Sequence, residues 1–555
     1  MDAVDSGLRW VGGITFNRVD PSDPAETGHF ISVLPSVYVT ASLGLTEPMW
    51  DLVSRSLAIM QRYAAFTYSV SNGLDANYFV SDFRRPDNLD VAGIAGEPGK
   101  VPILAFNRMT WDDYYYEQTQ QWIVLHELGH TLGLSHATGL PTGLDHSVFT
   151  VMSYNWVDFA DAETGEIGMP LTPMALDVAV LQAKYGAAVA NTGATTYRLG
   201  ATQDLDGADG TVQNGHGYIC IWDSAGFDEI AYDGSSGVLL NLNTATLRTT
   251  AFAADLADVI GDVAQSSRIY AGLDDYAQDE ITDVVQSAGG FFSSLLIDGG
   301  FAIGGYTIAQ GAQIEAARGG GGDDLLIGNQ VANLLQGNGG QDDLFGGWGA
   351  DTLDGGAGDD VVWGGLGDDR ISDTGGGSNY LRGEEGNDSV VGGAGFDDIN
   401  GNMGNDTGSG GLGEDWVVGG KDNDVLSGGD AFDIVYGNLG SDTLHGDAGD
   451  DIVRGGQQDD ILFGGAGDDY VSGDRDNDTI TGGAGADTFH SFAEAGLDRV
   501  LDFNRAEGDR VLLDAGTTYT VTEVGADTVI TMSAGQLVLV GVSMSSLTGA
   551  WITVG

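Results

Sequence analysis

The sequence predicts a multidomain α+β protein, with an N-terminal domain of mixed strands and helices followed by an all-β C-terminal half that contains a parallel β-roll. Three observations predict this fold class. Residues 1–190 alternate short apolar runs with segments of helical spacing. Residues 319–490 repeat Gly-Gly-x-Gly-x-Asp-x-U-x every nine residues, where U is large and apolar. Residues 491–555 return to ordinary strand alternation.

A chain of 555 residues is too long for one hydrophobic core. We expect four parts, at residues 1–190, 191–318, 319–490 and 491–555. The second part is read as a β-rich connecting region, in which residues 254–300 match no pattern that we can place. The last part is expected to cap the roll, because an open end would expose unpaired strand edges.

Within residues 1–190, strands are expected at 13–16, 76–80, 91–96 and 101–106. Helices are expected at 47–64 with Thr46 as its N-cap, at 119–132, and at 171–186 with Gly186 as its C-cap. The strand at 91–96 is our candidate for an edge strand that pairs with an extended peptide through main-chain hydrogen bonds.

The central motif is His126-Glu-Leu-Gly-His-Thr-Leu-Gly-Leu-Ser-His136. On a helix, His126 and His130 project from one face and can bind a single ion. Gly133 can end that helix and return His136 as a third nitrogen ligand. Three protein ligands with one open position describe a catalytic zinc site, in which Glu127 would reach a water molecule as a general base. One alternative to a catalytic zinc site is an ordinary surface helix with scattered histidines. A stronger alternative is a site that keeps its metal ligands but has lost its activity.

The segment Val151-Met152-Ser153-Tyr154 follows the third histidine, where the metzincin pattern has its Met-turn. These residues resemble the serralysin family of secreted zinc metalloproteases, whose Met-turn also reads Met-Ser-Tyr. The resemblance implies a metzincin catalytic domain with Met152 as the floor of the site. It also implies that Tyr154 is a displaceable fifth zinc ligand that stabilises the oxyanion. The segment 137–150 is short for that family.

The charge balance is strongly acidic. The chain has 21 Lys and Arg against 82 Asp and Glu, a formal net charge of −61. This balance argues against nucleic acid and anionic membranes as partners and favours many carboxylate-bound cations. The single cysteine, Cys220, excludes an intrachain disulfide. No apolar run reaches the roughly 18 residues of a membrane span. The first seven residues lack the pattern of a secretory signal peptide, so we expect another export address.

The nonapeptide repeat predicts two columns of carboxylates. Two repeats make one coil, so that residues eighteen apart stack, with Asp342 under Asp360 and Asp351 under Asp369. Such columns suit multiple structural Ca²⁺ ions, and folding and calcium binding should be one event. The candidate calcium ligands are Asp324, Asp342, Asp351, Asp360, Asp369, Asp388, Asp397, Asp406, Asp415, Asp424, Asp433, Asp442, Asp451, Asp460, Asp469, Asp478 and Asp487. Asn333 and Asn379 stand at two further sixth positions, and the spacing from Asp369 to Asn379 is ten rather than nine.

Two features of the C-terminal half allow more than one interpretation. Asp223 and Asp228 lie in a segment that resembles one in serralysins, and a calcium site and a plain turn explain these two residues equally well. In proteins with this repeat, an uncleaved C-terminal segment is the address for one-step secretion by ABC-type machinery. The tail Trp551–Gly555 fits that address loosely, because the acidic-then-apolar ending of many serralysins is missing.

The resemblance therefore implies a zinc metalloendopeptidase that acts on extracellular proteins and peptides. It would be a monomer, secreted from a Gram-negative bacterium by type I secretion. The alternative is a calcium-dependent surface or adhesive protein with a vestigial protease domain, which the length of the array favours and the intact Glu127, His136 and Met152 oppose. A cytolytic toxin would need a long apolar segment, and the sequence contains none.

Overall fold

The computed structural model describes residues 14–18, 47–70, 78–83, 93–95, 103–107, 117–136, 150–152, 169–170, 172–189, 192–199, 211–214, 217–244, 294–298, 301–373 and 375–555. The chain divides into two compact units, Met1–Ala316 and Ala317–Gly555. None of the helices in the described residues is long and apolar enough to cross a membrane.

The first unit contains a five-stranded sheet in the order β2-β1-β3-β5-β4. Its strands are β1 (Ile14–Arg18), β2 (Tyr68–Val70), β3 (Tyr78–Phe83), β4 (Gly93–Ala95) and β5 (Ile103–Asn107). Neighbouring strands are parallel except for β4, which runs antiparallel to β5 at the edge of the sheet. The strands predicted at 13–16, 76–80, 91–96 and 101–106 are thus confirmed.

Three helices accompany this sheet: α2 (Glu47–Tyr63), α4 (Glu117–Thr131) and α5 (Ala175–Tyr185). Helix α4 packs against α2, β4 and β5, and its residues from Gln121 to Gly129 are all buried. The N-cap predicted at Thr46 lies outside the described residues. Gly186 follows α5 with a φ of 87°, as predicted.

The predicted start of the third helix at residue 171 is wrong. Helix α5 begins at Ala175, because Met174 is extended, with φ −92° and ψ 175°. The Asp177 carboxylate accepts the N–H of Met174 at 2.9 Å, which satisfies one of the free N–H groups at the helix start. The N-terminus of helix α5 is therefore determined by the carboxylate of Asp177, two residues inside the helix, and not by a capping side chain before it.

The remainder of the first unit is β-rich. Its strands are β6 (Met169–Pro170), β7 (Thr196–Leu199), β8 (Thr211–Asn214), β9 (Gly217–Ile221), β10 (Glu229–Tyr232), β11 (Val238–Asn241), β12 (Ser294–Asp298) and β13 (Phe301–Ile308). Strand β7 pairs in parallel with β8 and β10, β9 pairs in parallel with β6 and β13, and β12 pairs antiparallel with β11 and β13. Strand β14 (Ala316–Arg318) spans the boundary between the units.

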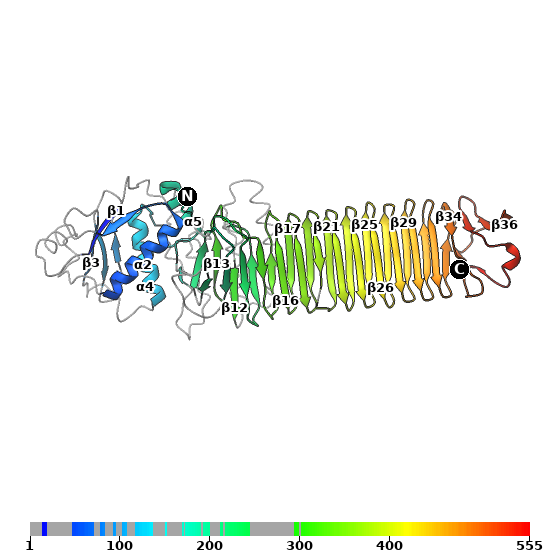
Figure 1. Ribbon diagram of the computed structural model, residues 1–555, viewed down its shortest axis with the longest axis horizontal. Coiled ribbons are helices and arrows are strands. Elements are labelled where there is room, and N and C mark those ends of the chain that lie inside the picture. Colours follow the sequence, from blue (N-terminus) through cyan, green and yellow to red (C-terminus); the bar gives the residue numbers. More distant parts are fainter. Residues whose placement is uncertain are drawn as a thin grey trace, which may run out of the picture. The chain divides into compact units, whose positions relative to one another are not determined.

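The second unit is a parallel β-roll whose consecutive strands alternate between two sheets (Figure 1). One sheet contains β15 (Leu325–Ile327), β17 (Asp343–Trp348), β19 (Val361–Leu366), β21 (Asn379–Glu385), β23 (Asp397–Met403), β25 (Trp416–Lys421), β27 (Ile434–Leu439), β29 (Ile452–Gln457), β31 (Tyr470–Asp474), β33 (Thr488–Ser491) and β35 (Arg510–Leu513). The other contains β16 (Leu334–Gly339), β18 (Thr352–Ala357), β20 (Arg370–Ser372), β22 (Ser389–Ala394), β24 (Thr407–Leu412), β26 (Val425–Asp430), β28 (Thr443–Ala448), β30 (Ile461–Ala466), β32 (Thr479–Ala484) and β34 (Leu497–Val500).

The core of the roll is a column of U residues that includes Leu344, Val362 and Leu381, each fully buried. Leu344 pairs in register with Val362, eighteen residues later, as the repeat predicts. Gly408 is the one glycine in this column, and the side chains of Leu426 and Val417 approach it closely. The space left by the missing side chain is thus filled by neighbouring coils.

The ten-residue spacing before Asn379 appears as a local shift in register. Val361 pairs with Tyr380 and Arg370 with Ser389, so that the offset is nineteen residues at this coil in both sheets. The extra residue is accommodated before β21, where buried Asp373 accepts the N–H of Gly376. The roll continues in its original register beyond this coil.

Residues 491–555 form the predicted end of the roll. Strands β36 (Thr520–Val524), β37 (Asp527–Thr531) and β38 (Gln536–Leu539) form an antiparallel meander. Strand β38 pairs with β34, and β39 (Ile552–Val554) pairs with β35. Both sheets of the roll are therefore extended by strands from the C-terminal segment.

Candidate metal centre

Helix α4 and the turn after it bring three imidazoles together. His126 and His130 lie one helical turn apart, and Gly133, with a φ of 88°, allows the chain to reverse toward His136. The Nε2 atom of His136 lies 3.1 Å from that of His130 and 3.2 Å from that of His126. These histidines are the one cluster of metal-ligand side chains that the described residues contain.

The other ring nitrogens show which atoms face the centre. Nδ1 of His126 donates to the carbonyl oxygen of Val151 at 2.8 Å, and Nδ1 of His130 donates to that of Leu134 at 2.9 Å. A carbonyl only accepts, so both rings carry their proton on Nδ1 and turn the Nε2 lone pair inward. Two nitrogens bound tetrahedrally to zinc at about 2.05 Å would lie about 3.3 Å apart. The observed distances fit such an ion.

Burial favours the neutral form of His126 and His136. It lowers the pKa of His126 to about 3, with the neighbouring His130 adding to the effect, and it also lowers the pKa of His136. Neutral imidazole is the form that binds a metal ion. Glu127 is buried as well, and burial raises the pKa of its carboxyl group to about 8. A carboxyl group with a pKa near neutrality is suited to exchange protons.

Met152 lies beneath helix α4. A Cβ atom at Gly129 would come within 2.7 Å of the Met152 Sδ atom, so the glycine allows the thioether to approach the helix backbone. Met152 is fully buried. Met152 packs against the helical turn that carries His126 and His130, and its flexible thioether fills the space below that turn.

Two residues that the sequence reading missed hold the Met152 segment in place. The Asp177 carboxylate accepts the hydroxyl hydrogen of Thr150 at 2.6 Å and the N–H of Val151 at 2.7 Å. Thr150 in turn accepts the N–H of Met152 at 3.0 Å. The acidic residue in the first turn of the helix at 175–185 was the available signal, but nothing in the sequence says which segment it contacts. Tyr154 and the segment 153–168 lie outside the described residues.

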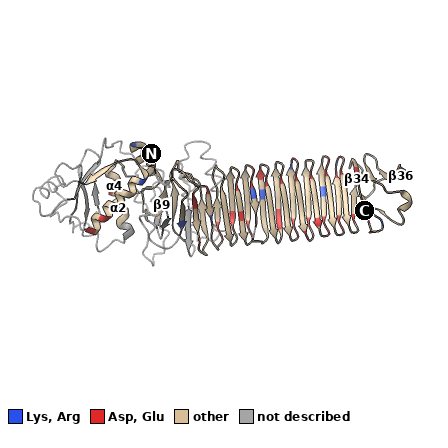
Figure 2. Cartoon of the chain, viewed as in Figure 1, with Lys and Arg blue, Asp and Glu red and all other residues tan. Residues whose placement is uncertain are grey.

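The roll presents a second kind of site, at its turns. Each sixth-position carboxylate uses Oδ1 to accept the N–H of the residue one coil earlier, for example Asp360 Oδ1 from Asp342 at 2.8 Å. The stacking predicted for Asp342 under Asp360 and Asp351 under Asp369 is thereby confirmed. Figure 2 shows the few Lys and Arg residues of the same region in blue on the ribbon.

The second oxygen of these carboxylates fits a cation. In the described residues, buried Oδ2 atoms have no hydrogen-bond partner in Asp342, Asp351, Asp369 and every ninth residue from Asp388 to Asp487. A Cβ atom at Gly337 would lie 2.2 Å from Asp342 Oδ2 and 2.4 Å from the Gly355 carbonyl oxygen, so the glycine keeps open a pocket of oxygen atoms. Buried oxygens without donors are costly, and an oxygen cage is what Ca²⁺ binds.

Asn379 departs from this pattern. Its Oδ1 accepts the N–H of Asp360 at 2.9 Å, as an aspartate would. Its Nδ2 donates to Asp397 at 2.8 Å and to Asp373 at 2.9 Å. An amide N–H₂ group therefore occupies the place of the second oxygen and partners the carboxylates itself, so the column is interrupted here for a cation.

Two aspartates beyond the repeats continue the columns. Asp498 Oδ1 accepts the N–H of Asp478 at 3.4 Å, and Asp509 Oδ1 accepts the N–H of Asp487 at 3.1 Å; both side chains are buried. Each opens a run of Asp-Arg-Val, which keeps the Asp-x-U part of the repeat without its glycines. That shortened pattern was the signal that could have identified them.

Asp223 and Asp228 are hydrogen-bonded within the first unit. Asp223 accepts the Tyr197 hydroxyl hydrogen at 2.7 Å, and Asp228 accepts the N–H of Thr195 at 2.8 Å. Burial, followed by the repulsion of Asp223 and Glu315, raises the pKa of Asp228 to about 6. The described residues hold this turn with ordinary hydrogen bonds, and the calcium reading remains a prediction.

The fold is that of a metzincin-like domain followed by a parallel β-roll. Residues 318–491 match the family of RTX calcium-binding nonapeptide repeats in a series of overlapping stretches. The roll therefore carries RTX repeats.

Among curated proteins, the chain is 30% identical over 232 residues to metalloprotease AprA of Pseudomonas entomophila, covering 38% of this chain and 37% of the relative. It is 29% identical over 257 residues to metallopeptidase AprA of Pseudomonas marginalis, covering 43% and 41%. It is 30% identical over 230 residues to serralysin of Photorhabdus luminescens, covering 38% and 36%. The resemblance to serralysin-type metalloproteases is thus confirmed, and the chain spans about two fifths of the length of these relatives.

Among solved structures, the chain matches the extracellular lipase LipA of Serratia marcescens with 16% identity and a TM-score of 0.18. The match covers 50% of this chain and 48% of that one. A superposition this poor carries no argument about fold or activity.

Proposed function

We propose that the protein is a secreted zinc-dependent endopeptidase of the serralysin type, with residues 1–190 as its catalytic part. The observation that carries this proposal is the convergence of three Nε2 lone pairs from His126, His130 and His136 beside buried Glu127. The names of the relatives support the same chemistry.

The three histidines would hold one zinc ion, which supplies a Lewis acid that polarises a peptide carbonyl and lowers the pKa of water. Glu127 accepts a proton from the attacking water and later donates it to the leaving amine. Burial raises the pKa of its carboxyl group, which makes the ionised carboxylate a stronger base. Met152 supports the imidazoles, and Tyr154 is proposed to donate a hydrogen bond to the developing oxyanion.

Substrate binding is assigned to the edge strand β4. Strand β4 ends its sheet and runs antiparallel to β5, and helix α4 packs against it. An extended protein or peptide substrate would add to this free edge by main-chain hydrogen bonds. The RTX roll is proposed to fold on calcium outside a Gram-negative cell, after type I secretion by ABC-type machinery that reads the C-terminal segment. The protein would act as a monomer.

The test is casein hydrolysis by the full-length protein in saturating calcium, with one zinc ion confirmed by metal analysis. Glu127→Gln should lower turnover by about 10²–10⁴-fold while zinc remains bound. Glu47→Gln, a change of the same chemistry on helix α2, serves as the matched control and should retain activity. Undiminished turnover in Glu127→Gln would contradict the assignment of the base. No cleavage by the folded, zinc-loaded wild type would favour the adhesive alternative.

A further inference from the structure

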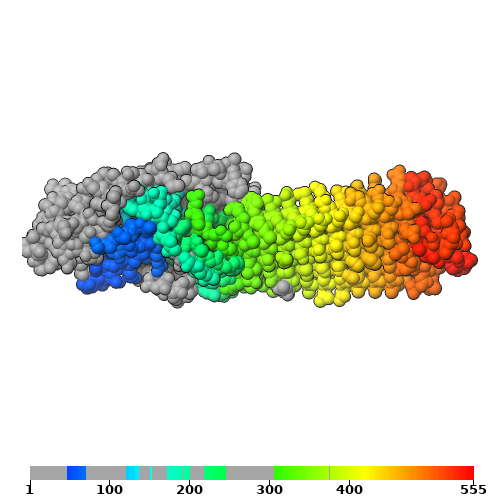
Figure 3. Space-filling view, turned by 45° about the horizontal axis from the view of Figure 1, so that its top comes forward, coloured from blue at the N-terminus to red at the C-terminus, as the bar shows by residue number. Residues whose placement is uncertain are grey.

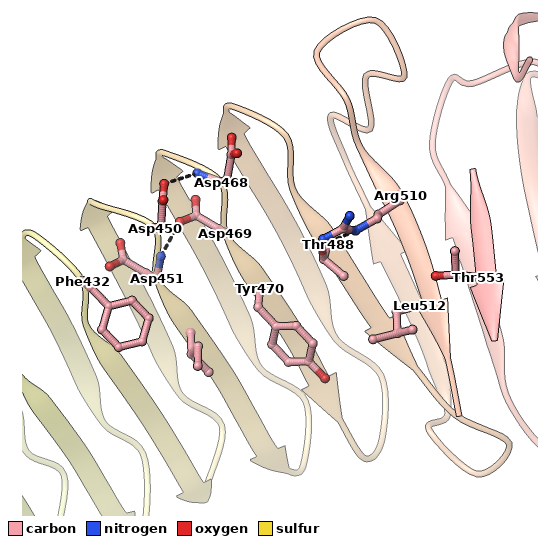
Figure 4. A pocket seen from close by; sticks show the side chains of 11 residues that line it. Phe432, Asp450, Asp451, Asp468, Asp469, Tyr470, Thr488, Arg510, Leu512 and Thr553 are labelled. Atoms are coloured by element: carbon pink, nitrogen blue, oxygen red, sulfur yellow. Dashed lines mark hydrogen bonds between the residues drawn. The ribbon is translucent and has the colours of Figure 1, made fainter. Parts of the chain in front are cut away.

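A groove of about 380 Å³ runs along one outer face of the roll, close to the turns (Figure 4). Its lining comes from several successive coils and from the end strands β35 and β39. The side chains that define this edge groove include Phe432, Asp450, Ile452, Asp468, Tyr470 and Arg510. The groove lies within the second unit, and its long axis crosses the strands.

The groove follows two columns set by the repeat. The inner column is read directly from strand pairing, in which Trp416, Ile434, Ile452, Tyr470, Thr488 and Arg510 follow one another coil by coil. The outer column, at the turns, contains residues eighteen apart: Phe396, Glu414, Phe432, Asp450 and Asp468. Both columns continue beyond the residues that line the groove, as far as Phe396 and Trp416.

Aromatic rings and carboxylates are interspersed along these columns. Phe396 and Phe432 are separated by two coils, about 9.6 Å, with Glu414 between them. Trp416 packs edge-on against Phe396, with ring centroids 6.1 Å apart. Trp416 is 50% exposed, and Phe396 and Phe432 are 41% and 39% exposed. Such exposure of large rings along one line is unusual for a surface with no ligand.

The polar groups beside the rings are fixed in position. Asp450 accepts the N–H of Asp468 at 2.7 Å, and Asp468 accepts the N–H of Ala486 at 2.8 Å. At the far end, Arg510 Nε donates to Thr488 Oγ1 at 2.8 Å (Figure 4). The groove thus offers an aromatic and aliphatic floor with preorganised acceptors and donors at its sides.

These features determine which class of ligand fits the edge groove. A polyanion would meet Glu414, Asp450 and Asp468 on a chain of formal charge −61. An extended peptide would need unpaired strand edges, whereas the strands beneath the groove pair with neighbours on both sides. A neutral glycan has an apolar ring face to stack on aromatic side chains and hydroxyl groups for carboxylates and guanidinium. In an extended β-linked glycan, every second sugar presents the same face, which matches the two-coil spacing of Phe396 and Phe432. Trp416 lies on the coil between them.

We propose that the edge groove binds an extended neutral β-linked polysaccharide. The inner and outer columns bind it across successive coils, so that the polymer lies perpendicular to the strands. This function belongs to the roll and does not depend on the zinc centre. It gives the folded roll a role as an anchor on a glycan matrix.

The other sheet supplies a matched control. Phe463 also points outward from its strand, β30, and stacks on His445 at 4.6 Å between ring centroids. It lies in the opposite sheet and so belongs to neither column of the groove. Phe463→Ala removes an outward ring from the roll, as Trp416→Ala and Tyr470→Ala do, without touching the edge groove.

The experiment uses the full-length protein in saturating calcium and about 0.5 M NaCl, which screens nonspecific charge effects. Binding to cellohexaose and chitohexaose is measured by calorimetry, and retention is measured on insoluble cellulose and chitin. Wild type should bind at least one of these glycans, and Trp416→Ala and Tyr470→Ala should each weaken binding by about tenfold. Phe463→Ala should leave binding unchanged. Far-UV circular dichroism and the calcium midpoint of each variant check that the roll still folds.

Several results would overturn the proposal. It fails if folded wild type binds none of the four neutral glycans, or if both groove variants bind as wild type does. It also fails if Phe463→Ala weakens binding as strongly as Trp416→Ala, because the groove would then have no special role.

Discussion

Asp177 accepts the N–H of Val151 at 2.7 Å, and the carbonyl oxygen of the same Val151 accepts Nδ1–H of His126 at 2.8 Å. The helix that follows the Met152 segment thereby holds the residue whose carbonyl group orients a candidate zinc ligand. Trp122 Nε1 donates to the same carbonyl at 3.1 Å. An orienting chain of this kind determines which ring nitrogen of His126 faces the ion.

Replacing Asp177 should therefore weaken metal binding. Asp177→Asn replaces a carboxylate oxygen, which only accepts hydrogen bonds, by an N–H₂ group, which donates them. The groups that Asp177 contacts, including the N–H of Val151 and of Met174, need an acceptor. We expect zinc affinity to fall by about 10–100-fold. Competition with a chromophoric chelator measures this affinity. Asp228→Asn, which removes another buried aspartate that accepts a backbone N–H, should leave zinc affinity unchanged; equal losses in both variants would indicate general destabilisation instead.

Replacing a glycine by alanine in a turn of the roll should have little effect at one position and should destabilise the roll at another position two residues away. At Gly337 a Cβ atom would meet Asp342 Oδ2 at 2.2 Å, whereas at Gly339 nothing lies closer than 3.8 Å. Gly337→Ala should raise the calcium concentration needed for folding and cost about 1–3 kcal/mol. Gly339→Ala should stay within about 0.5 kcal/mol of wild type. Calcium titration followed by circular dichroism compares the two, and equal midpoints would contradict the oxygen pocket.

Calcium binding should release protons near neutral pH. Burial, followed by the repulsion of neighbouring aspartates, raises the pKa of Asp342, Asp424 and Asp460 to about 8. Without calcium, these groups favour the folded roll below pH 4, and the contribution is lost as pH rises through 6 to 8. Calcium needs the ionised form, so its affinity should rise over the same range. Calorimetry in two buffers of different ionisation enthalpy counts the protons, and a buffer-independent heat would refute this coupling.

The two aspartates beyond the repeats should take part in calcium binding. Burial raises the pKa of Asp498 to about 7, as it does for aspartates inside the array. Asp498→Asn should lower the number of bound calcium ions by about one and weaken the end of the roll. Asp527→Asn, a change of the same chemistry in the C-terminal meander, is the control, because Asp527 accepts the N–H of Gly541 there. An unchanged calcium stoichiometry in Asp498→Asn would exclude Asp498 from the column.

The features that follow a period were predictable from the sequence, and those that depend on distant contacts were not. The nine-residue spacing fixed the stacking of Asp342 under Asp360, because the repeat itself dictates which residues are neighbours. The register His126, His130 and Gly133 likewise predicted the joining of three imidazoles. By contrast, the contact of Asp177 with Thr150 joins residues twenty-seven apart whose pairing depends on packing. The same carboxylate binds the start of helix α5, which begins at Ala175 and not at the predicted residue 171.

The amide of Asn379 has a consequence for how the roll melts. A solenoid behaves as a one-dimensional lattice, in which each coil is coupled mainly to its nearest neighbours. Where two carboxylates share a cation, that coupling rises with calcium concentration; where Nδ2 of Asn379 links Asp373 and Asp397, it does not. The link at Asn379 is thus independent of calcium, and as the ion is withdrawn the coupling between coils on either side of it falls while this link keeps its strength.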